Sequence, residues 1–199
     1  MNEPPGFTVG PLEPSHRDRV AEILRSTQNF RDEEVDVALE LFDESFVGAD
    51  YVSLGAFQRE TGDGRRETAT ASREQRSAPS PTSRLPSPVL VGFAIYGCTT
   101  ATDRTYDLYW IAVDRAAQGT GCGSVLLEEV ERRLEALHAR MLVIETSSRS
   151  DYATTRNFYL RRGYVEAARV RDFYAPQDDR IILTKRLAGS PRKGWGAVA

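Results

Sequence analysis

The sequence has few of the residues that disulfide frameworks and metal sites need. Its 199 residues include two cysteines, Cys98 and Cys122, and two histidines, His16 and His138. Two cysteines cannot form a disulfide framework, and the spacing of these four residues matches no zinc site. The sequence therefore predicts neither a disulfide framework nor a metal site.

Long hydrophobic runs and clustered positive charge are also missing. No run approaches the roughly 18 apolar residues of a membrane helix, and residues 1–5 lack the basic and then apolar order of a secretory signal. We therefore expect a cytoplasmic protein with no membrane partner. The formal net charge of −3, with no clustered basic surface, argues against a nucleic-acid partner.

One segment is almost devoid of core-forming side chains. Although 40% of the chain is hydrophobic, residues 58–88 contain only one leucine and three alanines among the apolar types, with many Ser, Thr, Pro and Arg. This composition predicts a disordered insertion loop. The remainder is long enough for a single domain over 1–187, and residues 188–199 are expected to form a flexible tail.

Hydrophobic periodicity predicts alternating helices and strands outside the insertion. Helices are expected from the Pro14-Ser15 start signal to about residue 26, and then over 32–46, 121–138 and 152–162. In the third helix, Glu128–Arg132 and Glu129–Arg133 are i,i+4 pairs. Strands are expected over 7–12, 51–57, 89–96, 106–113, 141–145, 164–173 and 181–187. This order predicts an α+β fold with a mixed sheet.

The sharpest chemical signal is Gln118-Gly119-Thr120-Gly121-Cys122-Gly123, between a strand and a helix. Glycines allow a tight turn, and the amide groups at the positive end of a helix dipole form an anion cradle suited to phosphate. The spacing matches neither G-x-G-x-x-G nor a P-loop, which requires lysine. A turn that uses glycine only for its geometry is the competing interpretation.

Two motifs in this order resemble the GNAT superfamily of acyl-CoA-dependent N-acyltransferases. Gln118, Gly121 and Gly123 satisfy its signature Gln/Arg-x-x-Gly-x-Gly/Ala, and residues 158–164, Phe-Tyr-Leu-Arg-Arg-Gly-Tyr, satisfy Phe/Leu-Tyr-x-x-x-Gly-Phe/Tyr. The resemblance is strongest over 89–187. It implies a mixed, mostly antiparallel sheet with helices on both faces.

The resemblance implies acetyl-CoA as cosubstrate, lying in a V between the strands at 106–113 and 141–146. Pantetheine would pair with the backbone of Ile111, Ala112 and Val113. The pyrophosphate would bind the amides of Gln118, Gly119, Thr120, Gly121, Cys122, Gly123 and Ser124. Cys122 itself is expected to be a small buried residue, because no histidine lies nearby to activate it.

Three residues are candidates for catalysis. Tyr159 occupies the family's position for the tyrosine that protonates or hydrogen-bonds the leaving thiolate. Asp107 and Glu145 correspond to strand carboxylates that serve as bases in different members, and the sequence does not choose between them. For the tyrosine the competing interpretation is core packing, and for either acid it is a structural ion pair or a solvated strand end.

The sequence also departs from the family, because Tyr152 occupies the position where many members have a cofactor-contacting asparagine. The expected function is transfer of an acetyl group from acetyl-CoA to a primary amine. Acids at 32–46 and at 172–179 would suit a cationic amine. The alternatives are acetylation of protein N-termini and a non-catalytic acyl-CoA-binding regulatory module. A homodimer is left open.

Overall fold

A computed structural model describes residues 6–48, 50–58 and 88–187. The strands are β1 Phe7–Pro11, β2 Tyr51–Gln58, β3 Val89–Cys98, β4 Thr105–Val113, β5 Met141–Ser147, β6 Val165–Ala175 and β7 Asp178–Arg186. The helices are α1 Arg17–Thr27, α2 Asp32–Glu44, α3 Cys122–Ala136 and α4 Ala153–Leu160, with short 3-10 turns η1 Pro14–His16, η2 Arg115–Ala117 and η3 Ser150–Tyr152.

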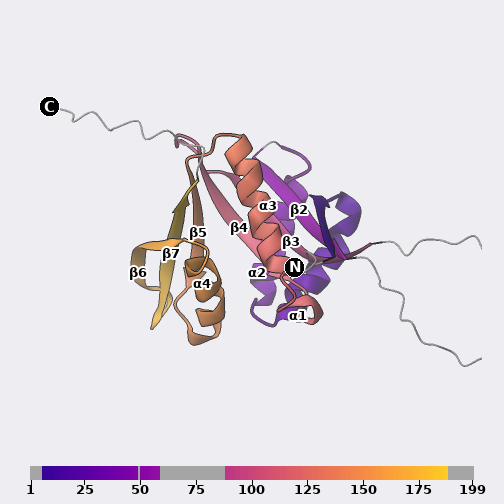
Figure 1. Cartoon of the computed structure of the whole chain (residues 1–199). Helices are drawn as coiled ribbons and strands as arrows, with labels where there is room; N and C mark the ends of the chain where they lie inside the picture. Colours follow the sequence, from indigo (N-terminus) through magenta and orange to yellow (C-terminus); the bar gives the residue numbers. More distant parts are fainter. Residues whose placement is uncertain (1–5, 49, 59–87, 188–199) are drawn as a thin grey trace, which may run out of the picture.

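The strands form one sheet of order β1-β2-β3-β4-β5-β7-β6. Neighbouring strands are antiparallel except β4 and β5, which are parallel because α3 connects them (Figure 1). The α+β class and the mixed, mostly antiparallel sheet predicted from the sequence are thus confirmed.

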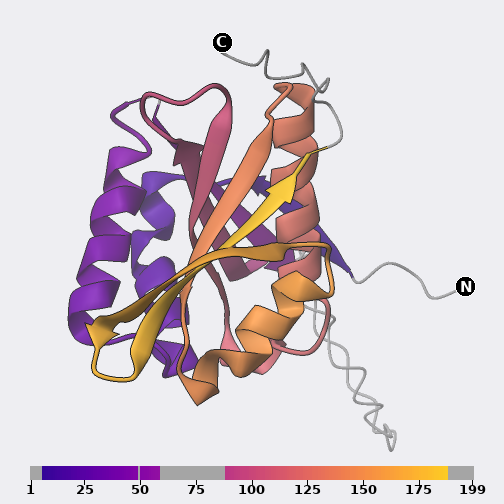
Figure 2. The same cartoon turned by 90° about the vertical axis from the view of Figure 1, so that its left-hand side faces the viewer.

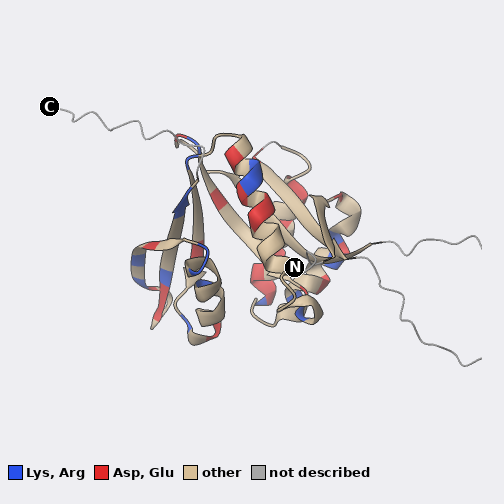
Figure 3. Cartoon of the chain, viewed as in Figure 1, with Lys and Arg blue, Asp and Glu red and all other residues tan. Residues whose placement is uncertain are grey.

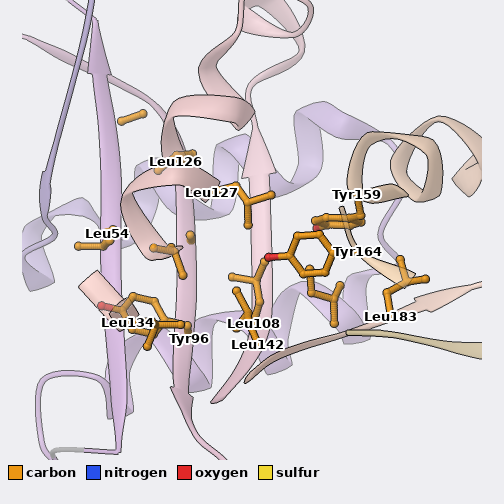
Figure 4. Packing of buried hydrophobic residues seen from close by; sticks show 14 of the residues in the cluster. Leu54, Tyr96, Leu108, Leu126, Leu127, Leu134, Leu142, Tyr159, Tyr164 and Leu183 are labelled. Atoms are coloured by element: carbon orange, nitrogen blue, oxygen red, sulfur yellow. The ribbon is translucent and has the colours of Figure 1, made fainter. Parts of the chain in front are cut away.

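Helices cover both faces of this sheet (Figure 2). On one face, α1 and α2 bury Ile23, Leu24 and Phe42 against Phe93 and other side chains of β3. On the opposite face, the core consists of leucines of α3, including Leu126, Leu127 and Leu134, packed with strand residues and with two tyrosines, Tyr159 and Tyr164 (Figure 4). Helices thus lie on both faces, as the resemblance implied, and the sheet is held between two separate apolar cores.

All predicted helices and strands exist, and their ends differ by a few residues. For example, β7 begins at Asp178 rather than residue 181 because it pairs with Ala175 in a tight hairpin. Gln58, placed in the insertion from the sequence, belongs to β2 and pairs with Val89. The rest of the predicted insertion, residues 59–87, and the predicted tail lie outside the described residues.

Two predicted absences can be compared only with the described part of the chain. In the ranges given above, no helix is long and apolar enough to cross a membrane. The same ranges contain no group of three or more His, Cys, Asp or Glu side chains that could hold a metal ion.

Candidate active site

The parallel strands β4 and β5 separate part of the way along their length. Their pairing runs from Thr105–Met141 to Leu108–Ile144 and then stops, although β4 continues to Val113 and β5 to Ser147. A cavity of about 650 Å³ lies at this separation, lined by residues of both strands together with residues of α2, α4 and the β6–β7 hairpin. The sheet therefore opens where β4 leads toward the glycine loop.

Pairing with β3 determines which backbone groups of β4 face this opening. Asp114 N–H donates to Val91 C=O at 2.8 Å, and Val113 and Ile111 oppose Gly92 and Ala94. In an antiparallel ladder this register directs the N–H and C=O groups of Ala112 toward β3 and those of Ile111 and Val113 away from it. Of the three residues predicted to pair with pantetheine, Ile111 and Val113 present their backbone to the gap.

The glycine loop has the geometry of an anion cradle. Gly119 and Gly121 have φ values of 78° and 95°, a left-handed conformation that favours glycine, and Gly121 is the N-cap of α3. Within the described residues, the backbone N–H groups of residues 119–123 have no protein acceptor. Unsatisfied amides at a helix N-terminus attract anions such as phosphate.

Side chains around the loop hold it without filling the cradle. The Gln118 side chain donates to Val113 C=O at 3.1 Å, and the Thr120 hydroxyl donates to Ala117 C=O at 2.6 Å. The Ser124 hydroxyl accepts a hydrogen bond from Arg162, whose guanidinium lies 3.8 Å from the Phe158 ring centroid. Arg162 was not a predicted site residue, because only the fold brings its side chain to the first turn of α3.

Cys122 is buried, as expected, and burial raises the pKa of its thiol to about 11. At neutral pH the thiol therefore stays protonated. This protonation state and the missing histidine argue against a nucleophilic role.

Tyr159 lines the cavity from α4 and is only 3% exposed. Its ring packs edge-on against Phe158 at a centroid distance of 5.1 Å. It also packs edge-on against Tyr164 at 5.6 Å (Figure 4). Burial raises the pKa of its hydroxyl above the ordinary value, so the group is protonated at neutral pH. A phenol in this state is a hydrogen-bond donor.

The two candidate carboxylates differ in their surroundings. Asp107 accepts a hydrogen bond of 2.6 Å from the Thr99 hydroxyl and lines a smaller pocket of about 300 Å³. Glu145 lines this pocket as well as the large cavity that contains Tyr159, and it pairs with Arg180. Of the two candidates, Glu145 is thus the one that lines the same cavity as Tyr159.

Two further cavity residues carry polar groups: Tyr152, at the position where many family members have an asparagine, and Thr146, which the sequence did not indicate. The Tyr152 hydroxyl donates to Asn29 C=O at 3.1 Å, which joins the start of α4 to the α1–α2 loop. Thr146 is 6% exposed, and its hydroxyl has no hydrogen-bond partner among the described residues. A buried orphan hydroxyl in a cavity is a position where a ligand's polar group can bind.

Comparison with known proteins agrees with this architecture. A family model described as an acetyltransferase (GNAT) domain matches residues 88–166. A solved structure assigned to the GNAT family of acetyltransferases, from Desulfovibrio desulfuricans, is 34% identical; the match covers 92% of this chain and 99% of that chain with a TM-score of 0.72. The chain therefore belongs to the GNAT acetyltransferase family.

More distant structures share the fold. The ribosomal-protein-S18-alanine N-acetyltransferase of Escherichia coli is 20% identical with a TM-score of 0.65. A Salmonella typhimurium protein described as an acetyltransferase, determined with its cofactor acetyl-CoA, is 15% identical with a TM-score of 0.64. Each match covers 96% of this chain and 99% of the other. No curated protein matches the sequence significantly.

Proposed function

We propose that this protein transfers the acetyl group of acetyl-CoA to a primary amine. The observation that carries the proposal is the separation of β4 and β5, which exposes backbone groups of β4 beside a cavity that contains Tyr159 and Glu145. The glycine loop with its free amides follows β4 directly. These features suit an extended, phosphorylated thioester, and the GNAT family assignment supports the same reaction.

The chain's polar groups fit such a cosubstrate along its length. The amides of residues 119–123 would bind the pyrophosphate, and the backbone of Ile111 and Val113 would bind the amides of the pantetheine arm. The orphan hydroxyl of Thr146 lies in the same cavity and would accept or donate one more hydrogen bond. When bound, acetyl-CoA supplies an activated acetyl thioester.

Transfer requires a base for the amine and a donor for the departing sulfur. The amine nitrogen forms a bond to the thioester carbonyl carbon, the carbon–sulfur bond breaks, and the nitrogen loses a proton. Glu145 would take this proton, directly or through water. Tyr159 would donate a hydrogen bond to the sulfur; its raised pKa favours such donation over complete proton transfer.

The test is release of free thiol from acetyl-CoA across a panel of amines and peptides, with the acetylated product identified by mass spectrometry. We expect equal amounts of thiol and N-acetylated product with at least one small amine. Binding of acetyl-CoA without release from any acceptor would favour a non-catalytic regulatory module. Turnover confined to peptides with free N-termini would favour acetylation of protein N-termini. A cytoplasmic location, a homodimer and the single-domain boundaries stay predictions.

A further inference from the structure

The cavity has a distinct face that is directed away from α3 and α4. Along β5 and β7, Ile144 and Ile181 pack in the core beneath α3. Because side chains alternate between faces, Glu145 and Ser147 point to the other face, as does Arg180, which pairs with Ser147. Asp178 lies two residues before Arg180 on β7, so its side chain points to the same face. We call this side, which also receives the N-terminal turn of α2, the acceptor face.

Acids outnumber bases in the cavity lining. Four carboxylates line it, against two guanidinium groups. Each guanidinium already has an acidic partner: Arg31 contacts Glu34, and Arg149 contacts Asp151. Acidic residues occur on α2 and on the β6–β7 hairpin, on opposite sides of the opening (Figure 3). The lining therefore carries a net negative charge.

Asp178 is the most enclosed of these carboxylates, at 8% exposed. One oxygen accepts a hydrogen bond from the Ser147 hydroxyl, and within the described residues the carboxylate forms no ion pair. A buried carboxylate with no cation in direct contact is costly, since one hydroxyl does not replace its hydration. Tyr174 lines the same cavity and offers its ring surface to a cation, whereas the Tyr152 ring already has the Arg149 guanidinium 5.6 Å from its centroid. A positively charged ligand group would balance Asp178.

We propose that the acceptor is an alkylamine with a second ammonium group, which Asp178 binds while the first amine reacts. This inference rests on the proposed acetyl transfer and names its substrate class. The last paired position of β5, Ile144, and Ser147 are three residues apart, roughly 10 Å along an extended strand. The two nitrogens must therefore be separated by several methylene groups, which disfavours the shortest diamines.

Three acceptors of equal length provide the test: cadaverine, aminopentanol and aminovalerate carry a terminal ammonium, hydroxyl and carboxylate. We expect kcat/KM for cadaverine to exceed that for aminopentanol by about tenfold or more, since a charge-assisted hydrogen bond contributes this much. Ethylenediamine is too short for Asp178 to bind one amine while the other reacts, so its kcat/KM should not show this advantage. A preference for aminovalerate would instead assign the subsite to Arg180, whose buried Nε has no partner among the described residues, and would overturn the proposal.

Asp178→Asn keeps the shape of the side chain and its acceptor for Ser147. We expect this variant to acetylate cadaverine and aminopentanol with similar kcat/KM, so that the preference for cadaverine is lost. Asp103→Asn, which removes an exposed charge from the β3–β4 turn, is the matched control and should retain the preference.

Equilibrium binding to the CoA-loaded protein separates this proposal from the proposed reaction. Tighter binding of cadaverine than of aminopentanol, abolished by Asp178→Asn, supports the subsite even where no thiol is released. Equal binding of the two ligands to the wild-type protein, or an unchanged difference in Asp178→Asn, would overturn it. Acetylation of aminopentanol with no preference for cadaverine would refute the subsite and leave acetyl transfer standing.

Discussion

At the scale of single residues, Tyr159 combines burial with access to a cavity. Its ring is part of the core beneath α3, whereas the residue also lines the opening between β4 and β5. Burial raises the pKa of the hydroxyl, which therefore stays protonated over the range in which a CoA thiolate would form. Such a group can stabilise the leaving sulfur without first being ionised.

Tyr159→Phe removes the hydroxyl and keeps the ring. We expect kcat to fall by about a hundredfold while the affinity for acetyl-CoA stays within about twofold, because the lost hydrogen bond acts on the departing sulfur. Steady-state kinetics and calorimetric binding measure the two quantities. The matched control is Tyr164→Phe, which removes a buried hydroxyl bonded to Glu131 outside the cavity. Equal kcat in Tyr159→Phe and the wild type would remove the proposed role.

Sequence could nominate Tyr159, Glu145 and the glycine loop as candidates because each lies within a local motif or at a strand position. It assigned the acids at 172–179 to a cationic amine but could not single out Asp178 as the enclosed one, because that depends on β7 pairing with β5 in a register that sets Asp178 beside Ser147. Thr146 was missed for a similar reason. Its hydroxyl is orphaned by packing, which no spacing along the chain reports.

At the scale of elements, α3 joins the core to the anion cradle. Glu129 lies on its partly buried side and accepts hydrogen bonds of 2.7 Å from both Arg132 and Arg133. The predicted pair Glu129–Arg133 is confirmed, but the predicted pair Glu128–Arg132 is wrong. Arg132 turns instead to Glu129, which two guanidinium groups share. Hydrogen bonds from Arg132, with those from Arg133, lower the pKa of Glu129 to about 2.

Glu129→Gln should destabilise the fold in a pH-dependent way. Because the folded-state pKa lies below the ordinary value of 4.5, the carboxylate stabilises the fold fully above about pH 4.5 and loses this contribution as the pH falls toward 2. We expect the free energy of unfolding to drop by about 1 kcal/mol at pH 7 and by less at pH 3. Urea denaturation at both pH values measures this. A difference of the same size at both would contradict the assignment.

Element boundaries were less predictable than element order. Strand β5 continues to Ser147 because β7 provides partners as far as Arg180, and a polar Glu-Thr-Ser sequence gives no hydrophobic signal for that extension. Helix α3 begins at Cys122, where Gly121 adopts a left-handed cap. Strand pairing and cap geometry thus determine where these elements end, whereas hydrophobic periodicity predicts only that they exist and in which order.

At the scale of the whole molecule, the segment between β2 and β3 joins the sheet near the cradle. Gln58 and Val89, which flank it, are paired neighbours, and Val91 bonds to Asp114 just before the glycine loop. The sequence placed the segment ahead of the cofactor motif without indicating this proximity. Strand order brings them together, since β3 runs antiparallel to β4.

Replacing residues 59–88 with a short glycine-containing turn tests whether the segment contributes to binding. Paired ends permit such a turn, and a shorter connection lowers the entropy of the unfolded chain. We expect the affinity for CoA to stay within about twofold and the melting temperature to stay equal or rise. Titration calorimetry and a thermal melt measure both. A large loss of affinity in a folded variant would make the segment part of the site.

In the proposed complex, acetyl-CoA occupies the opening between β4 and β5 and the amide cradle that follows it. Amide hydrogen exchange of the full chain, with and without saturating CoA, tests this directly. We expect slower exchange in peptides covering residues 111–113 and 119–124, with no change along β1 and β2. Bound CoA that leaves exchange at residues 119–124 unaltered, or protects another surface instead, would contradict it.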